Sequence, residues 1–187
     1  GIRSGVRSAQ VNGRPVRQMG SNILPPDMLF GRILQRGPRL IQLAKAVGMK
    51  TLRVWGGGVI LPDEMYDLAD ELGIMLISEF PMANFRPPTD PVFLANLETT
   101  ARDCVRQVRN HPSIVEWNAG NEIIWDKNHP AIPILDKVVR EEDGRIFRID
   151  DDGGHYHPFG ATDGPALYDF FDAVLTSPYG RSTQRMS

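Results

Sequence analysis

Residues 114–122 read Ile-Val-Glu-Trp-Asn-Ala-Gly-Asn-Glu (IVEWNAGNE), and this stretch joins two unlike halves. Its first half is rich in β-branched and aromatic residues, which is typical of a buried strand. Its second half is a turn of small residues that ends in an amide and a carboxylate, Asn121 and Glu122. In parallel α/β folds, functional side chains follow the carboxyl ends of buried strands. The stretch therefore suggests both a fold and a site.

Helical and strand patterns alternate on both sides of this stretch. Apolar residues at helical spacing predict four helices, at residues 37–48, 61–73, 91–109 and 131–144. Short apolar runs predict strands around them, at residues 50–58, 74–80, 114–117 and 145–150. Upstream, Asn12-Gly13 forms the turn of a predicted hairpin, whose second strand begins the alternating series. Alternation of this kind predicts a parallel sheet covered by helices.

Two arrangements fit such a series, an open doubly wound sheet and a closed eight-stranded barrel. No phosphate-binding glycine fingerprint follows any predicted strand, and the run at 56–58 is only a glycine triplet. Polar and aromatic residues collect instead at the carboxyl ends of successive strands, namely Asn22, Arg53, Trp55, Glu79, Asn118, Asn121 and Glu122. In a (β/α)8 barrel the active-site groups come from that face. The predicted fold class is therefore α/β, a parallel (β/α)8 TIM barrel.

The chain is short for a complete barrel, which needs about 250 residues. Only five strands can be placed before Asp150, and a long polar run at 151–164 precedes one last helix-like segment. We therefore expect a partial barrel over residues 11–187. Residues 1–10 are expected to be the remnant of a preceding β-sandwich or a linker.

The composition narrows the function classes. The 187 residues carry a formal net charge of -2, with 41% hydrophobic and 24% charged residues, as in an ordinary soluble domain. This balance argues against nucleic acid or an anionic membrane as the main partner, and no run of about 18 apolar residues predicts a transmembrane helix. The single Cys104 excludes an internal disulfide and a cysteine zinc site. His155 and His157 lack a visible third ligand, so neither a metal nor a cofactor is predicted. Compartment and oligomeric state stay open.

The Asn-Glu pair suggests acid–base chemistry. A carboxyl group at the end of a buried barrel strand is expected to be partly desolvated, and desolvation favours its protonated form. Glu122 would then suit a general acid for a leaving alkoxide. Asn121 could donate a hydrogen bond to a sugar 2-hydroxyl, and Trp55 and Trp117 could contact the apolar face of a sugar. The alternative is that Glu122 begins a loop, Asn121 caps it and Trp117 packs in the core.

Longer motifs around these residues resemble glycoside hydrolase family 2. The run Asn110-His111-Pro112-Ser113, followed by the apolar strand and Asn-Glu, is similar to the acid/base signature of that family. Residues 52–80 resemble its second and third barrel strands, and the Arg-Val-Trp-Gly-Gly-Gly motif at 53–58 has the form of the β-mannosidase-like branch. Residues 11–27 look like the barrel entry of that branch, so the resemblance covers about residues 11–148.

The resemblance implies a role for each matching residue. Glu122 matches the general acid/base, Asn121 the 2-hydroxyl ligand and Trp55 an active-site tryptophan. Arg53 matches an arginine near the nucleophile, although a buried structural ion pair is the alternative. Glu79 stands where relatives often carry an acidic residue, and is grouped with the substrate-binding residues.

One required group has no match. Retaining glycosidases need a second carboxylate about 5–5.5 Å from the acid, and the resemblance places it in a Ser-Glu-Tyr/Phe-Gly context. The nearest stretch, at 177–180, has Pro178 in place of the glutamate. Glu79 or one of the aspartates at 150–152 would have to be recruited, and no motif supports that.

The leading hypothesis is a retaining exo-β-glycosidase, β-mannosidase-like, that acts on an oligosaccharide or glycoside. The alternatives are a catalytically inactive carbohydrate-binding remnant and an endo-glycanase barrel of the same clan. This chain alone is expected to lack the nucleophile.

Overall fold

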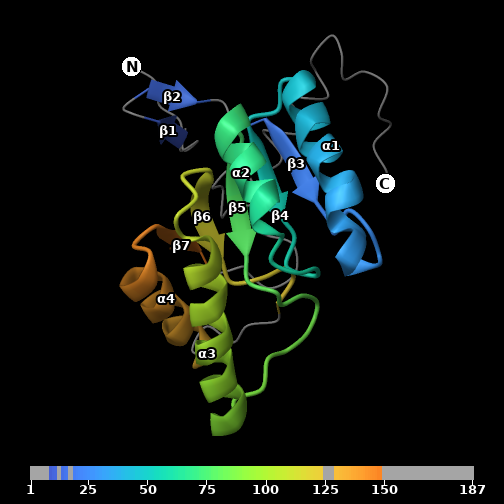
Figure 1. Ribbon diagram of the computed structural model, residues 1–187. Coiled ribbons are helices and arrows are strands. Elements are labelled where there is room, and N and C mark those ends of the chain that lie inside the picture. The colour runs from blue at the N-terminus through green and yellow to red at the C-terminus, as the bar shows by residue number, and fades with distance from the viewer. Residues whose placement is uncertain (1–8, 12–13, 17–18, 124–128, 149–187) are drawn as a thin grey trace, which may run out of the picture.

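Five parallel strands form a single sheet in the computed structural model, which describes residues 9–11, 14–16, 19–123 and 129–148. The strands are β3 (Gly20–Ile23), β4 (Thr51–Val54), β5 (Met75–Glu79), β6 (Ile114–Asn118) and β7 (Ile146–Arg148). They lie side by side in the order in which they follow one another along the chain (Figure 1). Every pairing is parallel. Four of the five strands predicted before Asp150 are therefore confirmed, as β4, β5, β6 and β7.

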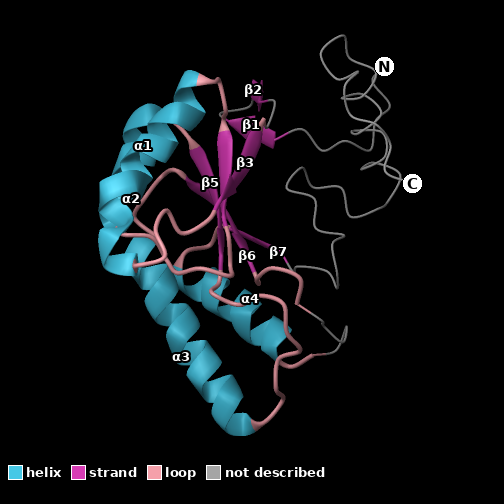
Figure 2. Ribbon diagram, turned by 90° about the vertical axis from the view of Figure 1, so that its right-hand side faces the viewer, coloured by secondary structure: helices cyan, strands magenta, loops and turns pink. Residues whose placement is uncertain are grey.

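The helices lie on one face of this sheet. They are α1 (Ile33–Ala46), which follows a 3-10 turn η1 (Phe30–Arg32), α2 (Asp63–Leu72), α3 (Pro91–Val108) and α4 (Ala131–Glu142). Figure 2 shows α1, α2 and α3 on the same side of the strands, and α4 packs against α3. A doubly wound sheet would carry helices on both faces, whereas a barrel keeps its helices outside. The described residues thus form part of a TIM barrel, as predicted.

Local sequence signals explain most helix boundaries. Gly73 ends α2 in the left-handed conformation, with φ of 65°. Asp90 caps α3, because its side chain accepts a hydrogen bond from the Phe93 backbone N–H at 2.9 Å. The predicted start of the first helix at residue 37 is wrong. The helix begins at Ile33 and runs through Pro38, so this proline lies inside the helix and does not mark its start.

The N-terminal segment forms the predicted hairpin. β1 (Ala9–Val11) and β2 (Arg14–Val16) pair antiparallel, with Val11 opposite Arg14. The hairpin lies near the amino ends of the sheet strands (Figure 1). One expectation is wrong here, because the first sheet strand is β3 and not the second strand of the hairpin. Asn22, expected beyond a strand end, consequently lies inside β3.

The hydrophobic core lies between the sheet and the helices. It includes fully buried side chains from the sheet, from α2 and from the loop after β5, among them Leu76, Tyr66 and Phe80. Cys104 of α3 is also buried, as expected for a small apolar side chain, and burial raises the pKa of its thiol to about 11. Among the described residues, no helix has the length and apolar character needed to cross a membrane.

Candidate active site at the carboxyl end of the sheet

Arg53 joins three strands at the carboxyl end of the sheet. It stands on β4, and only 11% of its side chain is exposed. Its Nε and Nη2 atoms both lie 2.7 Å from Oε1 of Glu79, at the end of β5. Nη2 also donates to Oδ1 of Asn121 at 2.7 Å, and Nη1 donates to Oδ1 of Asn22 at 3.3 Å. Four residues expected at this end are therefore in direct contact.

Glu79 is the buried anchor of this group. Its side chain has no exposed surface, and it accepts hydrogen bonds from the Gly56 backbone N–H at 2.7 Å and from Asn118 Nδ2 at 2.8 Å. Burial raises the pKa of Glu79, although Arg53 and these hydrogen bonds oppose the rise. Both carboxylate oxygens are already engaged by the protein. Glu79 is thus placed to fix Arg53, and this geometry supports the alternative of a buried structural ion pair.

Gly56 permits this arrangement by its lack of a side chain. A Cβ atom there would lie 2.7 Å from the carbonyl oxygens of Phe80 and Met82 and 3.2 Å from Oε2 of Glu79. Any other residue would therefore push the backbone away from the carboxylate. This glycine of the run consequently has a structural cause, which is the close approach of the loop after β4 to the loop after β5.

Asn121 and Glu122 follow β6 in a loop that is tied to the loop after β5. Asn121 forms an isolated parallel bridge with Ala83. Its side chain is buried at 9% exposure, and its Nδ2 donates to Oδ1 of Asn84 at 3.3 Å. Glu122 accepts a hydrogen bond from Asn84 Nδ2. The expected partial desolvation of Glu122 is not seen, because it lies beyond the last residue of β6 and is exposed in the described structure.

The two candidate sugar platforms differ in exposure. The Trp55 side chain is partly exposed, and its indole lies so close to Gly57 that a Cβ there would come within 2.1 Å of the ring. Trp117 has no exposed surface, stacks on Phe80 with centroids 5.3 Å apart, and donates from Nε1 to Asp143 at 2.6 Å. A ring with no exposed face cannot contact a sugar. Trp117 is therefore a core residue, and the expectation of sugar contact is withdrawn.

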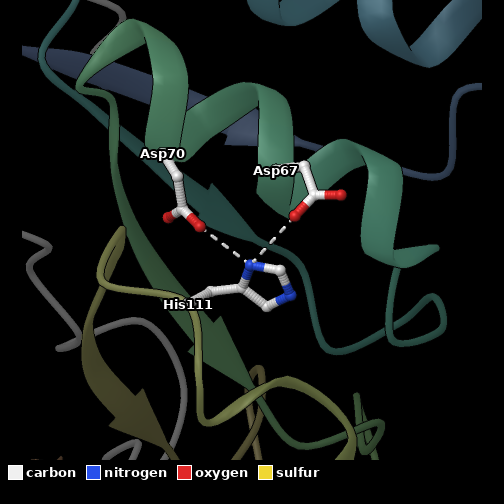
Figure 3. A group of neighbouring side chains, drawn as sticks. All are labelled: Asp67, Asp70 and His111. Atoms are coloured by element: carbon white, nitrogen blue, oxygen red, sulfur yellow. Dashed lines mark hydrogen bonds and ion pairs between the residues drawn. The ribbon is translucent and has the colours of Figure 1, made fainter.

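A second polar cluster lies at the opposite end of the sheet. Figure 3 shows His111, in the turn before β6, pointing toward Asp67 and Asp70 of α2. His111 Nδ1 lies 2.8 Å from Oδ2 of Asp70 and 3.7 Å from Asp67, and its ring stacks on Tyr66. The other Asp70 oxygen accepts the Ser113 backbone N–H at 2.7 Å.

Two aspartates and a histidine are possible metal ligands. The Asp70 oxygens and His111 Nδ1 already have partners within the protein, however, and these contacts connect α2 to the turn before β6. Burial works to raise the pKa of Asp70, but hydrogen bonds from Ser113 and His111 outweigh it and hold the pKa below its ordinary value. We therefore interpret this cluster as a structural tie. His155 and His157 lie outside the described residues.

Two residues of the site were not found from the sequence. Gly56 was read only as part of a glycine run, and Asn84 lies in a loop without a recognisable motif. The positive φ of Asn84, 59°, and its contact with Glu122 become visible only in the structure.

An α/β barrel with carboxylates, amides and an arginine at the carboxyl ends of its strands defines a class, the TIM-barrel enzymes. Residues 61–151 match the family model described as "Glycosyl hydrolases family 2, TIM barrel domain". The chain is 43% identical over 115 residues to β-mannosidase A of Aspergillus terreus, which covers 61% of this chain and 12% of that protein. It is 41% identical over 114 residues to β-mannosidase of Mus musculus, covering 60% and 13%. The chain belongs to glycoside hydrolase family 2.

Solved structures agree with this assignment. The β-D-mannosidase from Dictyoglomus thermophilum superposes with a TM-score of 0.64 at 32% identity, covering 75% of this chain and 19% of that one. A β-glucuronidase from Parabacteroides merdae, at 23% identity, shares the fold with a TM-score of 0.62 over 74% of this chain and 18% of its own. The chain thus spans only a small part of the length of these relatives.

Proposed function

We propose that this chain is part of the catalytic barrel of a retaining exo-β-glycosidase, β-mannosidase-like, that hydrolyses terminal β-linked sugars. The observation that carries the proposal is the position of Glu122. It follows β6 at the carboxyl end of the sheet, beside Asn121 and in contact with Asn84. The family membership and the β-mannosidase relatives support the substrate class.

Glu122 is proposed to act as the general acid/base. In the first step its carboxyl group donates a proton to the glycosidic oxygen as the bond to the leaving group breaks. In the second step its carboxylate removes a proton from the attacking water. The exposure of Glu122 suits this role, because a group that exchanges protons with both substrate and water must be reachable.

Asn121 is proposed to bind the sugar 2-hydroxyl. Its amide orientation is fixed from both sides, because Oδ1 accepts from Arg53 and Nδ2 donates to Asn84. An amide nitrogen carries two hydrogens, so one N–H remains for a substrate hydroxyl. Arg53, held by Glu79, contributes by fixing Asn121. Trp55 is proposed as the sugar platform, since its indole is partly exposed and stands two residues after Arg53, just beyond the end of β4.

The nucleophile is proposed to lie outside the described residues. Glu79 is not assigned this role, because Arg53, Gly56 and Asn118 bind both of its oxygens and its side chain is fully buried. The aspartates at 150–152 and the stretch 177–180 lie outside the described part of the chain.

The first test is Glu122→Gln in the longest native polypeptide that contains this sequence. General acid–base groups contribute roughly 10²–10⁴-fold to rate. We expect a loss of that order in kcat/KM on mannobiose, whose leaving group needs protonation, and a much smaller loss in kcat/KM on an aryl mannoside with a good leaving group. Glu64→Gln, at an exposed position on α2, is the matched control. Equal rates for Glu122→Gln and wild type on mannobiose would refute the assignment.

The wild-type protein also tests the alternative of a carbohydrate-binding remnant. Calorimetry that detects mannose or mannobiose binding, together with an absence of turnover, would support the remnant. Turnover of mannan but not of aryl mannosides would point to an endo-acting enzyme.

A further inference from the structure

Asn84 lies between the two residues proposed to act on the substrate. We infer that Asn84 is a positioning residue, which fixes the carboxylate of Glu122 and the amide of Asn121 in the geometry that proton transfer requires. This inference rests on the proposed role of Glu122 as acid/base. It is carried by four features: a backbone bridge, two unusual backbone conformations, a side chain used at both ends, and a continuous chain of contacts to the buried Glu79.

The backbone bridge places Asn84 next to the acid/base. Asn121 N donates to Met82 O at 2.9 Å, and Asn84 N donates to Asn121 O at 2.8 Å. These bonds extend the parallel pairing of β5 and β6 beyond the ends of both strands. The loop after β5 is consequently held in fixed register against the loop after β6, and Asn84 cannot move independently of Asn121.

Asn84 and Glu122 both adopt left-handed backbone conformations. The φ angles are 59° for Asn84 and 49° for Glu122, and these are the non-glycine residues with positive φ within the described ranges. Asparagine tolerates this conformation better than other residues, whereas it is unfavourable for glutamate. Such unfavourable conformations gather at functional sites, where surrounding contacts hold them in place. The hydrogen bond from Asn84 is one of the contacts that hold Glu122 in this conformation.

The side chain of Asn84 uses both of its ends. Nδ2 donates to Oε2 of Glu122, and Oδ1 accepts from Nδ2 of Asn121. A donor and an acceptor on one short side chain are needed for this pair of contacts, and aspartate lacks the donor. Oε2 of Glu122 is thereby engaged, which leaves Oε1 to exchange a proton with the glycosidic oxygen.

The contact chain extends from this pair into the core. Asn84 contacts Asn121, Asn121 contacts Arg53, and Arg53 contacts Glu79. The exposed Glu122 is therefore linked through Asn84 to a carboxylate with no exposed surface. Because Glu122 lies on a loop, its placement depends on this link to the rigid sheet.

The test compares Asn84→Gly and Asn84→Asp in the longest native polypeptide that contains this sequence. Glycine adopts positive φ without strain, so Asn84→Gly removes the amide while sparing the backbone. Aspartate keeps the shape but replaces the donor with a like charge facing Glu122. Asn96→Asp, at an exposed position on α3, is the matched control for the added charge. Unfolding midpoints of all variants separate a local effect from loss of fold.

The readout is the dependence of kcat/KM on the leaving group, measured with a series of aryl β-mannosides and mannobiose, because kcat/KM reports the step in which the leaving group departs. Mispositioning the acid should cost on the order of tenfold in kcat/KM on mannobiose for Asn84→Gly, a fraction of the whole general-acid contribution. The loss should shrink toward none for the best aryl leaving groups and should be larger for Asn84→Asp. If Asn84 had a merely structural role, its variants would lower kcat/KM by the same factor for every substrate in the series.

Glu122→Gln in the same series separates the two ideas. A steep leaving-group dependence for Glu122→Gln, with a uniform or absent loss for both Asn84 variants, overturns the inference and leaves the proposed function intact. A flat dependence for Glu122→Gln, or no turnover by the wild-type protein, overturns both.

Discussion

Two networks of charged side chains in this protein use the same chemical groups, but their arginines differ in exposure. At the carboxyl end of the sheet, Arg53 pairs with Glu79, and their side chains are 11% and 0% exposed. Between α3 and α4, Arg102, Arg106 and Arg109 all contact Glu142. In this second network the Arg106 and Arg109 side chains are 54% and 41% exposed, whereas those of Arg102 and Glu142 are 21% and 9% exposed.

Burial determines what each network can do. The α3–α4 contacts lie at the surface, where water and salt screen charges and an ion pair contributes little. The buried pair cannot exchange its partners for water, so each member fixes the direction of the other. That difference explains why the Arg53–Glu79 network holds Asn121 and Asn84 in place, whereas the α3–α4 network only joins two helices. A buried ion pair therefore adds little net stability, but it holds the neighbouring side chains of a site in fixed positions.

The largest expected effect is at the centre of the buried network. Glu79→Gln keeps the shape of the side chain but removes the negative charge that pairs with Arg53, and breaking a buried pair in this way costs roughly 3–5 kcal/mol. We expect a loss of that size in the free energy of unfolding, measured by urea titration. The loss should hardly change between 0.1 M and 1 M NaCl, because a buried pair is little screened. A loss below about 1 kcal/mol would mean that Arg53 has access to water.

The fold could be predicted from the sequence because its signals are local. Helical spacing and terminal glycines such as Gly73 identify the elements, and the order of strands and helices implies the parallel sheet. The start of α1 could not be predicted. A proline usually lies in the first turn of a helix, but Pro38 lies inside α1. The separation of β2 from β3 was also not visible in the sequence.

The site could be predicted only as far as strand ends allow. Arg53, Glu79 and Asn121 were expected at one edge, and the structure brings them into contact. Trp117 was misassigned because neighbouring strand residues face opposite sides; Asn118 reaches Glu79, so Trp117 faces the helices. Asn84 was missed because its contacts join residues 37 and 38 positions apart, and no local pattern encodes such a contact.

The partly buried pair of Asp70 and His111 is expected to give an effect of intermediate size. Asp70→Asn removes the charge that accepts from Ser113 and faces His111, and a hydrogen bond to a charged group contributes about 1.5–3 kcal/mol. The folded-state pKa of Asp70 is lowered from its ordinary value of 3.8. Its stabilising contribution is therefore present above about pH 4 and is lost as pH falls through the folded-state pKa. Urea titrations at pH 7 and pH 3 should show that the variant differs from wild type more at pH 7. An equal difference at both pH values would contradict the ionic role of Asp70.

The smallest effect is expected in the exposed network. Hydrogen bonds from Arg106 and Arg102 lower the pKa of Glu142 from 4.5 to about 2. Because the folded-state pKa is the lower one, Glu142 stabilises the fold above pH 4.5, and this contribution disappears as pH falls toward 2. Glu142→Gln should therefore lower the urea midpoint slightly at pH 7, with Glu64→Gln as the control at an exposed position on α2. In 1 M NaCl the difference should shrink, because the pairs with the exposed Arg106 and Arg109 are screened at that salt concentration. A difference that persists in high salt and matches that of Glu79→Gln would contradict this comparison. It would mean that the Arg53–Glu79 network and the α3–α4 network contribute to stability in the same way, whatever their burial.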